Sequence, residues 1–327
     1  MMNITLEEKT LELKFTWKIA RNASDFKRNF FIKINDGDFE AIGETAPNVR
    51  YGESPELIAS QFQLLMDNQL QAVKNEEMLL SLFNKFPTCN SLRFGIESAF
   101  INFWSKNEVE KYLSIPSASK IYTAFTMPIM PIEEMCAFYK KYNLSRFKYL
   151  KLKINAENGY DALKEISKVT ATQHIMIDGN EAFQHPDDVL RYIDFIKDFP
   201  IAFLEQPMPS AKIEEYKYLK PKSKVLLIGD ESITDHPDMD SIALQFHGVN
   251  MKLQKAGGYV NGLRIINEAR KRNLKTMIGC MVETSIGIGS AMRLCADIDF
   301  IDLDGFLILK DEPFLKIKEE DGILSFI

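Results

Sequence analysis

Histidine and cysteine are scarce in this 327-residue sequence, and their scarcity narrows the chemistry that it can support. The four histidines lie far apart, and none pairs with another at the spacing of metal ligands. The four cysteines form no CxxC pair, which favours free thiols in a reducing compartment. We therefore expect neither a histidine- or cysteine-bound metal nor a disulfide framework, and we expect a cytoplasmic location.

Long apolar runs and an excess of basic charge are also missing. No stretch approaches the ~18 apolar residues of a membrane span, and Glu7, Glu8 and Lys9 stand where a signal peptide has its apolar core. Acidic residues outnumber basic ones by 46 to 40, which disfavours general nucleic-acid binding. A small anionic substrate stays open, because a pocket can be locally basic. Homo-oligomer formation also stays open, since pattern alone does not separate surface from interface.

The first third of the sequence indicates a separate α+β capping domain over residues 1–118. Residues 10–46 alternate like a β-meander, with a hairpin turn at residues 35–38 and a polar loop at residues 21–27. Residues 55–107 then show the apolar spacing of helices. Strands followed by helices are typical of an α+β unit.

Between residues 119 and 310, short apolar segments alternate with amphipathic helical patterns. They recur at roughly 25 residues, the length of one strand–helix unit, which predicts an α/β fold, a modified (β/α)8 TIM-like barrel. A doubly wound sheet is disfavoured, because no GxGxxG fingerprint follows the first segment. Residues 311–327 predict a C-terminal hairpin that returns to the capping domain. The eight segments are residues 122–126, 149–154, 175–178, 201–205, 225–230, 249–252, 276–279 and 300–304.

Carboxylates end three successive segments of the predicted barrel. Asp178, Glu205 and Asp230 close the third, fourth and fifth segments, and the carboxyl ends of barrel strands form the active-site face. An oxygen-only set without nearby histidine or cysteine suits a hard cation, so we expect Mg²⁺. Each carboxylate alone could instead cap the helix that follows it, but three in succession favour the metal.

Lysines stand on both sides of this ring. Lys151 and Lys153 alternate with apolar residues on the second segment, so both point to one face of a strand. Lys252 ends the sixth segment, four places round the ring from Lys153. Two amines on opposite sides of one carbon can remove a proton and return it on the other face, through a metal-stabilised enolate. The alternative is that these lysines only form ion pairs with the carboxylates.

Together these motifs resemble those of the enolase superfamily, in its muconate-lactonizing-enzyme subgroup. The resemblance covers essentially the whole chain. It implies that the three carboxylates bind Mg²⁺, that Lys153 and Lys252 are the acid–base pair, and that Lys151 binds the substrate carboxylate and tunes Lys153. The motifs that carry it are Lys151-Leu-Lys153, Asp178, Glu205, Asp230 and Asn250-Met-Lys252-Leu253.

One motif points to a particular member of this subgroup. Asp302-Leu-Asp304 looks like the Asp-x-Asp pair of the dipeptide epimerases of the L-Ala-D/L-Glu type, which holds the free α-ammonium of a dipeptide. Two carboxylates opposite a metal also suit a cationic group. The resemblance further implies substrate contacts at Thr126, Met281 and Glu283, which lie in segments that look like strands one and seven of that family.

Two positions bear on substrate detail. Arg21, in the polar loop, resembles an arginine that contacts the side-chain carboxylate in Ala-Glu epimerases, although Arg28 or Arg50 could serve instead. Gln254 departs from the residue type expected shortly after Lys252. The departure leaves the chemistry intact and affects only the choice of substrate.

The sequence therefore predicts a Mg²⁺-dependent dipeptide epimerase. It would invert the α-carbon of the C-terminal residue by two-base 1,1-proton transfer, with Ala-Glu as a candidate substrate. An o-succinylbenzoate synthase or N-acylamino-acid racemase shares the lysines and the metal but has no ammonium to recognise, so Asp302 and Asp304 argue against it. A non-catalytic metal-binding scaffold would need neither Lys153 nor Lys252.

Overall fold

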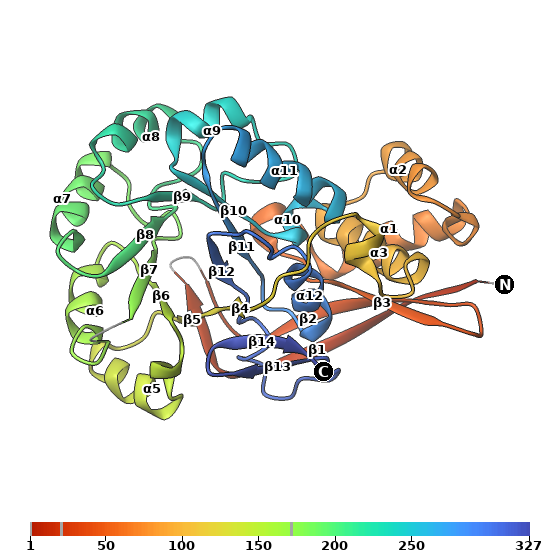
Figure 1. Ribbon diagram of the computed structural model, residues 1–327, viewed down its shortest axis with the longest axis horizontal. Coiled ribbons are helices and arrows are strands. Elements are labelled where there is room, and N and C mark those ends of the chain that lie inside the picture. Colours follow the sequence, from red (N-terminus) through yellow and green to blue (C-terminus); the bar gives the residue numbers. More distant parts are fainter. Residues whose placement is uncertain (1, 20–21, 171–172) are drawn as a thin grey trace.

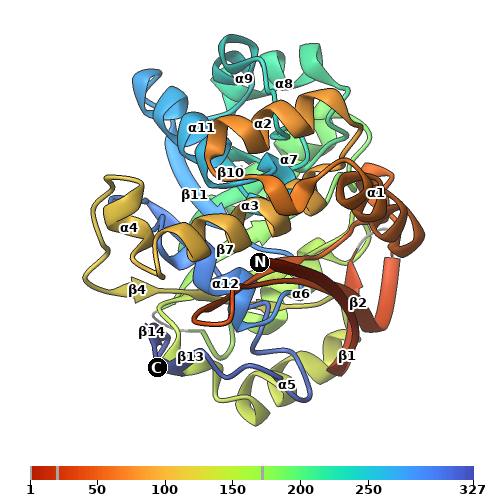
Figure 2. The ribbon, with the colours of Figure 1, turned by 90° about the vertical axis from the view of Figure 1, so that its right-hand side faces the viewer.

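The computed structural model describes residues 2–19, 22–170 and 173–327, in two packed parts. The N-terminal unit is an antiparallel sheet of three strands, in the order β1-β2-β3, covered by helices (Figure 1). Figure 2 views the molecule with this unit toward the reader. Its elements are β1 (Asn3–Ile19), β2 (Asn22–Asn35), β3 (Glu40–Thr45), α1 (Pro55–Asp67), α2 (Glu76–Lys85), α3 (Asn90–Trp104) and α4 (Val109–Tyr112).

The second part is a parallel sheet of eight strands, hydrogen-bonded in the order β5 to β12 and curled into a barrel. Its strands are β5 (Ala124–Met127), β6 (Tyr149–Lys153), β7 (His174–Asp178), β8 (Ile201–Glu205), β9 (Leu227–Gly229), β10 (Gly248–Met251), β11 (Lys275–Gly279) and β12 (Phe300–Asp302). The predicted (β/α)8 barrel with an N-terminal capping unit is therefore confirmed.

Helices wrap the outside of the barrel (Figure 1). Side chains that face its interior, such as Met176, Phe203 and Met277, are fully buried and fill it as a packed core. The helices are α5 (Met135–Lys141), α6 (Gly159–Ile166), α7 (Pro186–Ile196), α8 (Ile213–Leu219), α9 (Met239–Gln245), α10 (Leu253–Ala256), α11 (Tyr259–Lys271) and α12 (Ser285–Met292). None of the described helices is long and apolar enough to cross a membrane.

The ends of the barrel region differ from the prediction. The expected first strand is divided: β4 (Ile121–Tyr122) lies outside the barrel sheet, and the barrel strand begins at Ala124. The C-terminal hairpin is formed by β13 (Ile317–Glu320) and β14 (Ile323–Phe326), and β14 pairs with β4. The proposed domain limits themselves stay a prediction.

The polar loop predicted between the first two strands is largely strand. β2 already begins at Asn22, and residues 22–24 pair with residues 17–19 of β1. Residues 22–25 of β2 show no alternation of apolar and polar side chains, so the sequence pattern predicts a loop there. Arg21 itself lies outside the described residues.

A break in the pairing of β1 directs this hairpin over the barrel. The register shifts between Glu12 and Trp17, and the released stretch pairs with the segment after β12, through Lys14 N–H to Ile308 O at 2.9 Å and Lys310 N–H to Glu12 O at 2.8 Å. Further along, Ile129 N–H donates to Lys18 O at 2.9 Å. These bonds hold the end of the hairpin beside the strand ends of the barrel (Figure 1).

Two buried glutamates of the N-terminal unit join it to the barrel at the starts of barrel helices. Glu44 accepts hydrogen bonds from Thr284 N–H (2.9 Å), Thr284 Oγ1–H (2.7 Å) and Gly287 N–H (2.8 Å), at the start of α12. Glu97 of α3 accepts from Tyr259 N–H at the start of α11. Gly258 has φ of +145°, and a Cβ there would lie 1.8 Å from Glu97 Oε2, so only glycine allows this approach.

We expect Glu44→Ala to destabilise the protein strongly. It leaves buried donors without an acceptor, at about 1–3 kcal/mol each, so the free energy of unfolding should fall by at least about 3 kcal/mol. Urea unfolding measures this change. Glu40→Ala, at an exposed glutamate on the same strand, should change it little. Equal effects of the two substitutions would show that the junction does not depend on Glu44.

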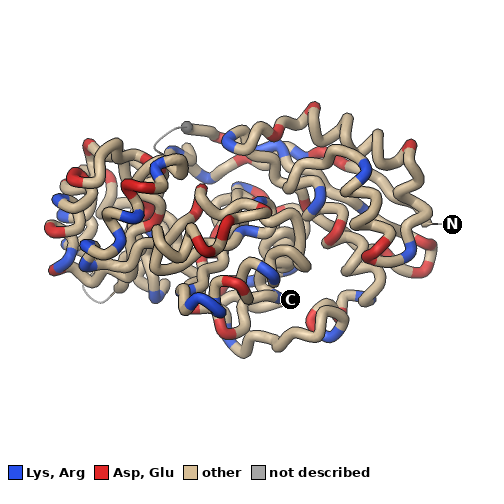
Figure 3. Tube along the Cα trace, turned by 90° about the horizontal axis from the view of Figure 1, so that it is seen from above, with Lys and Arg blue, Asp and Glu red and all other residues tan. Residues whose placement is uncertain are grey.

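Acidic and basic residues are interspersed along the chain in both parts of the molecule (Figure 3). The charges of the site described next are therefore a local arrangement, not an extension of a face of one sign.

Candidate active site

A cavity of about 460 Å³ lies at the carboxyl ends of the barrel strands, where both parts of the molecule meet. The barrel supplies lysines and aspartates, and the N-terminal unit supplies the β1–β2 hairpin and residues 46–55. The site residues predicted from the sequence that line it are Thr126, Lys151, Lys153, Asp230, Lys252, Met281, Asp302 and Asp304.

Lys151 lies at the centre of a buried cluster of carboxylates. Its Nζ is 2.8 Å from Glu205 Oε2, 3.1 Å from Asp178 Oδ2 and 2.9 Å from Asp302 Oδ2. Burial opposes the charge of this side chain, but Asp178, Asp302 and Glu205 outweigh it and raise the pKa of Lys151 well above its ordinary value. Lys151 is therefore a fixed positive charge in the lining of the cavity.

Lys153 and Lys252 come from opposite sides of the barrel. Lys153 ends β6 and its Nζ lies 2.8 Å from Asp178 Oδ2, while Lys252 follows β10 and its Nζ lies 2.8 Å from Asp230 Oδ2. Their strands are four places apart in the eight-strand order. Both amines line the cavity, so a ligand in it would contact them from two sides.

Gly279 makes room for the second of these amines. A Cβ at this position would lie 3.0 Å from Lys252 Cε and 2.6 Å from Asn250 Oδ1. The bare backbone of β11 is thus part of what positions Lys252.

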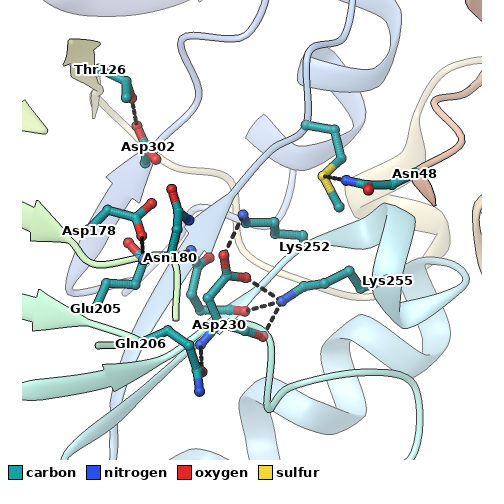
Figure 4. A network of polar contacts seen from close by, with 12 residues as sticks. Asn48, Thr126, Asp178, Asn180, Glu205, Gln206, Asp230, Lys252, Lys255 and Asp302 are labelled. Carbon is teal, nitrogen blue, oxygen red and sulfur yellow. Dashed lines mark hydrogen bonds and ion pairs between the residues drawn. The ribbon is translucent and has the colours of Figure 1, made fainter. Parts of the chain in front are cut away.

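The three predicted metal ligands lie at the ends of neighbouring strands, and all are buried (Figure 4). Asp178 ends β7, Glu205 ends β8, and Asp230 directly follows β9. As the side chains lie, no three Asp, Glu, His or Cys side chains among residues 2–19, 22–170 and 173–327 converge to hold a metal ion. Lys151 bridges Asp178 and Glu205 instead, so a cation would compete with it for these oxygens.

The chemistry of this donor set nevertheless fits a hard cation. All three ligands are carboxylates, and they lie within one buried cluster. Burial, and after it the neighbouring Asp178, raise the pKa of Glu205 to about 7, so the charged form of this carboxyl is disfavoured. A divalent cation bound to its oxygens would favour the charged form.

Asp302 and Asp304 also join the two edges of the barrel sheet. Thr126 N–H donates to Asp304 Oδ2 at 2.5 Å, and Thr126 Oγ1–H donates to Asp302 Oδ1 at 3.2 Å. Leu303 N–H donates to Thr123 Oγ1 at 2.8 Å. Burial and Asp302 raise the pKa of Asp304 to about 7, so the pair forms an acidic wall of the cavity that a cation would stabilise.

The remaining predicted contacts fall in different places. Met281 lines the cavity, and its Sδ lies 3.6 Å from Asn48 Nδ2. Glu283 is buried behind the wall, where it accepts from Met281 N–H at 2.8 Å and from Gln254 Nε2–H at 2.9 Å. Gln254 also accepts from Ala46 N–H at 3.0 Å. This unexpected glutamine therefore joins the barrel to the N-terminal unit.

The sequence reasoning missed a second lysine on Asp230. Lys255 Nζ lies 2.5 Å from Asp230 Oδ1, while Lys252 contacts the other oxygen of this carboxylate, and Lys255 is buried on α10 (Figure 4). Burial lowers the pKa of Lys255, and Asp230 offsets this only in part. Asn180 and Asn250 were missed as well. Asn180 Oδ1 accepts a hydrogen bond from Lys153 Nζ at 3.2 Å, and Asn250 Nδ2 donates one to Glu205 Oε1 at 2.7 Å. Both asparagines could have been predicted from the sequence, because Asn180 stands two residues after Asp178 and Asn250 two residues before Lys252.

Comparison with known proteins identifies the family. A family model described as "Enolase C-terminal domain-like" matches residues 134–307. An L-Ala-D/L-amino acid epimerase of Pedosphaera parvula is 32% identical, over 99% of this chain and 96% of that protein. The chain belongs to the enolase superfamily. This enolase-superfamily member is an isomerase, and its predicted likeness to the dipeptide epimerases is confirmed.

Solved structures agree on the fold of this superfamily member. An enolase family member of Agrobacterium tumefaciens with homology to dipeptide epimerases, bound to sodium and L-Ala-L-Glu, has a TM-score of 0.91 at 24% identity, covering 100% of this chain and 98% of its own. The dipeptide epimerase of Cytophaga hutchinsonii, complexed with Mg and D-Ala-L-Val, has a TM-score of 0.90 at 18% identity, covering 99% and 92%.

Proposed function

We propose that the protein is a dipeptide epimerase that inverts the α-carbon of the C-terminal residue by moving a proton between Lys153 and Lys252. The observation that carries this proposal is the pair of lysines on opposite sides of one cavity, with an acidic pair, Asp302 and Asp304, on its wall. The names of the related proteins in P. parvula and A. tumefaciens support a dipeptide as the substrate.

The two lysines would exchange roles in each turnover. One neutral amine removes the α-proton from its face of the substrate, and the other, protonated, delivers a proton to the opposite face. The configuration is thereby inverted, and the two amines finish with their protonation states exchanged. The reverse reaction begins from that state, so one site serves both epimers.

The other groups would bind the substrate and support the charge that develops in it. Asp302 and Asp304 would hold the free ammonium of the dipeptide, and Lys151 would contribute positive charge toward the substrate carboxylate. Asp178, Glu205 and Asp230 would hold Mg²⁺, which supplies stabilisation for the negative charge on that carboxylate when the α-proton leaves. The Mg-bound epimerase of C. hutchinsonii supports this choice of metal.

A dipeptide library in D₂O with Mg²⁺ tests the proposal by mass spectrometry. We expect deuterium at the C-terminal α-carbon of some dipeptides and none in N-acylated amino acids. Exchange confined to N-acylamino acids would favour the racemase alternative, and formation of o-succinylbenzoate would favour the synthase. No exchange with any of them would leave the non-catalytic scaffold.

Neutralising one aspartate of the acidic wall should selectively lower the turnover of dipeptides that carry a free ammonium. We expect Asp304→Asn to lower kcat/KM for a free dipeptide by about 10²-fold, because the ammonium loses a buried charged partner. Its N-acetylated analogue has no ammonium, so any residual exchange of that analogue should not fall. Steady-state rates on both compounds measure the difference. A similar loss on both would mean that Asp304 acts only in the barrel seam with Thr126.

A further inference from the structure

The turn that follows β7 contacts two groups of the proposed site. It begins at Asp178, whose Oδ1 accepts a hydrogen bond from Asn180 N–H at 3.0 Å. The side-chain Oδ1 of Asn180 accepts from Lys153 Nζ at 3.2 Å. Asn180 is buried and lines the cavity. The conformation of this one residue therefore affects both a proposed metal ligand and a proposed base.

The backbone of this turn has a conformation that costs free energy. Asn180 has φ of +43° and Glu181 has φ of +64°, both in the left-handed region. Asparagine adopts this region more readily than most residues do, but glutamate has no such preference. Two such residues in succession persist only when surrounding contacts hold them. One of these contacts is a backbone hydrogen bond from Glu181 N–H to Gln206 O at 2.8 Å.

The side chain of Glu181 makes further contacts, and these reach the N-terminal unit. Arg50 donates from Nε to Glu181 Oε2 at 3.2 Å and from Nη2 to Oε1 at 2.9 Å. Ser210 N–H donates to Glu181 Oε1 at 2.8 Å. The glutamate side chain is only 7% exposed, and a two-bond contact of arginine with such a carboxylate is stronger than a surface ion pair. Arg50 thus fixes Glu181 from across the junction of the two parts.

The same contacts disfavour a direct role of Arg50 in substrate binding. The sequence offers Arg50 as one possible contact for an acidic substrate, and it lines the cavity. Its Nε and Nη2 donors, however, are the ones that a substrate carboxylate would need for two-point binding, and both contact Glu181. Binding a substrate in that way would take Arg50 away from a buried carboxylate, which is unfavourable.

Resting on the proposed function, we propose that Arg50 is a positioning residue for Lys153. Through Glu181 it holds the turn after β7 in the conformation that keeps Asn180 against the amine of Lys153. Its effect should fall on one face of the substrate α-carbon, because Lys252 is held instead by Asp230 from the other side of the barrel. Any effect through Asp178 should appear as a higher Mg²⁺ requirement and disappear at saturating Mg²⁺.

The test measures loss of the α-proton signal in D₂O by ¹H NMR, at saturating Mg²⁺. It starts from each pure epimer of the dipeptide that exchanges fastest in the library. We expect Arg50→Gln to slow exchange of one epimer by about tenfold through kcat, and that of the other by less than about twofold. The slowed epimer should be the one that Lys153→Ala no longer exchanges. A residue with a merely structural role would slow both epimers alike.

Two further variants and a control accompany this measurement. Glu181→Gln should cause the same one-sided loss, and the double variant should be no slower than either single one, since both substitutions break the same contact. Arg50→Lys keeps the charge but not the two-bond geometry, so it should recover only part of the rate. Arg191→Gln, at an exposed arginine of α7 that pairs with Asp188, should change exchange of neither epimer.

The outcomes separate this inference from the function on which it rests. Equal slowing of both epimers, or no slowing, would show that Arg50 does not act through Lys153, and the inference would be wrong while the epimerase stands. A higher KM for both epimers at unchanged kcat would mean that Arg50 binds the substrate, which also overturns the inference. If the wild type exchanges no dipeptide α-proton at all, the proposed function itself fails, and the inference with it.

Discussion

Replacing Lys153 or Lys252 with alanine should abolish epimerisation, with a loss of about 10³-fold or more in kcat. Each variant should nevertheless keep half of the chemistry. The remaining amine can still exchange the α-proton of the epimer that presents its hydrogen to that side, but it cannot deliver a proton to the other face. We therefore expect each variant to exchange one epimer with solvent deuterium without inverting it, and the two variants to select opposite epimers.

Measurement by ¹H NMR of the loss of the α-proton signal, starting from each pure epimer, reveals this selectivity. Lys148→Ala, at the exposed lysine just before β6, should behave as the wild type. A variant of either lysine that epimerises at the wild-type rate in both directions would rule out the two-base assignment. Loss of exchange from both epimers in both variants would instead indicate that one lysine only positions the other.

The second large effect concerns the carboxylate cluster. Chelation of divalent cations should abolish activity, and added Mg²⁺ should restore it. Glu205→Gln should lower activity by about 10²-fold at moderate Mg²⁺ and recover in part at high Mg²⁺, because the amide removes one charge from the donor set. Asp187→Asn, at an exposed aspartate of α7, should leave the Mg²⁺ requirement unchanged.

The same substitution should not unfold the metal-free protein. Burial and Asp178 raise the pKa of Glu205 to about 7, above the ordinary value near 4.5. A raised carboxyl pKa in the folded state means that Glu205 costs stability progressively as pH rises from about 4.5 to 7. Glu205→Gln removes this cost, so its metal-free unfolding midpoint at pH 8 should equal or exceed that of the wild type. A clearly lower midpoint would show that the charge of Glu205 is needed for folding.

The repeated strand–helix units of the barrel could be predicted because the barrel strands are buried on both faces. Such strands read as short continuous apolar runs, so the charged residues at their ends stood out, as with Asp178 in Ile177-Asp178-Gly179. The first barrel strand was harder to place. Ile121 and Tyr122 are apolar and aromatic like the strand that follows, but they pair with the C-terminal hairpin. Local periodicity predicts a strand and does not identify the strand with which it pairs.

The parts of the site that escaped prediction depend on tertiary contacts. Lys255 looks like an ordinary helical lysine until α10 is placed against Asp230. Residues 22–27 look like a polar loop, but they extend a hairpin that is held by backbone bonds from β1 to residues 308–310. Lys27 therefore lines the cavity because of contacts that are made elsewhere in the chain.

The most direct test of the account is the stereochemical course of one turnover in D₂O. A pure L,L-dipeptide with a C-terminal glutamate is incubated with the Mg²⁺-loaded protein, and substrate and product are separated early in the reaction. Two bases on opposite faces predict that the L,D-product carries deuterium at the inverted α-carbon while unreacted substrate still carries hydrogen. Product that retains the original hydrogen would mean that a single group takes the proton away and returns it, and it would contradict the assignment of Lys153 and Lys252 as a pair.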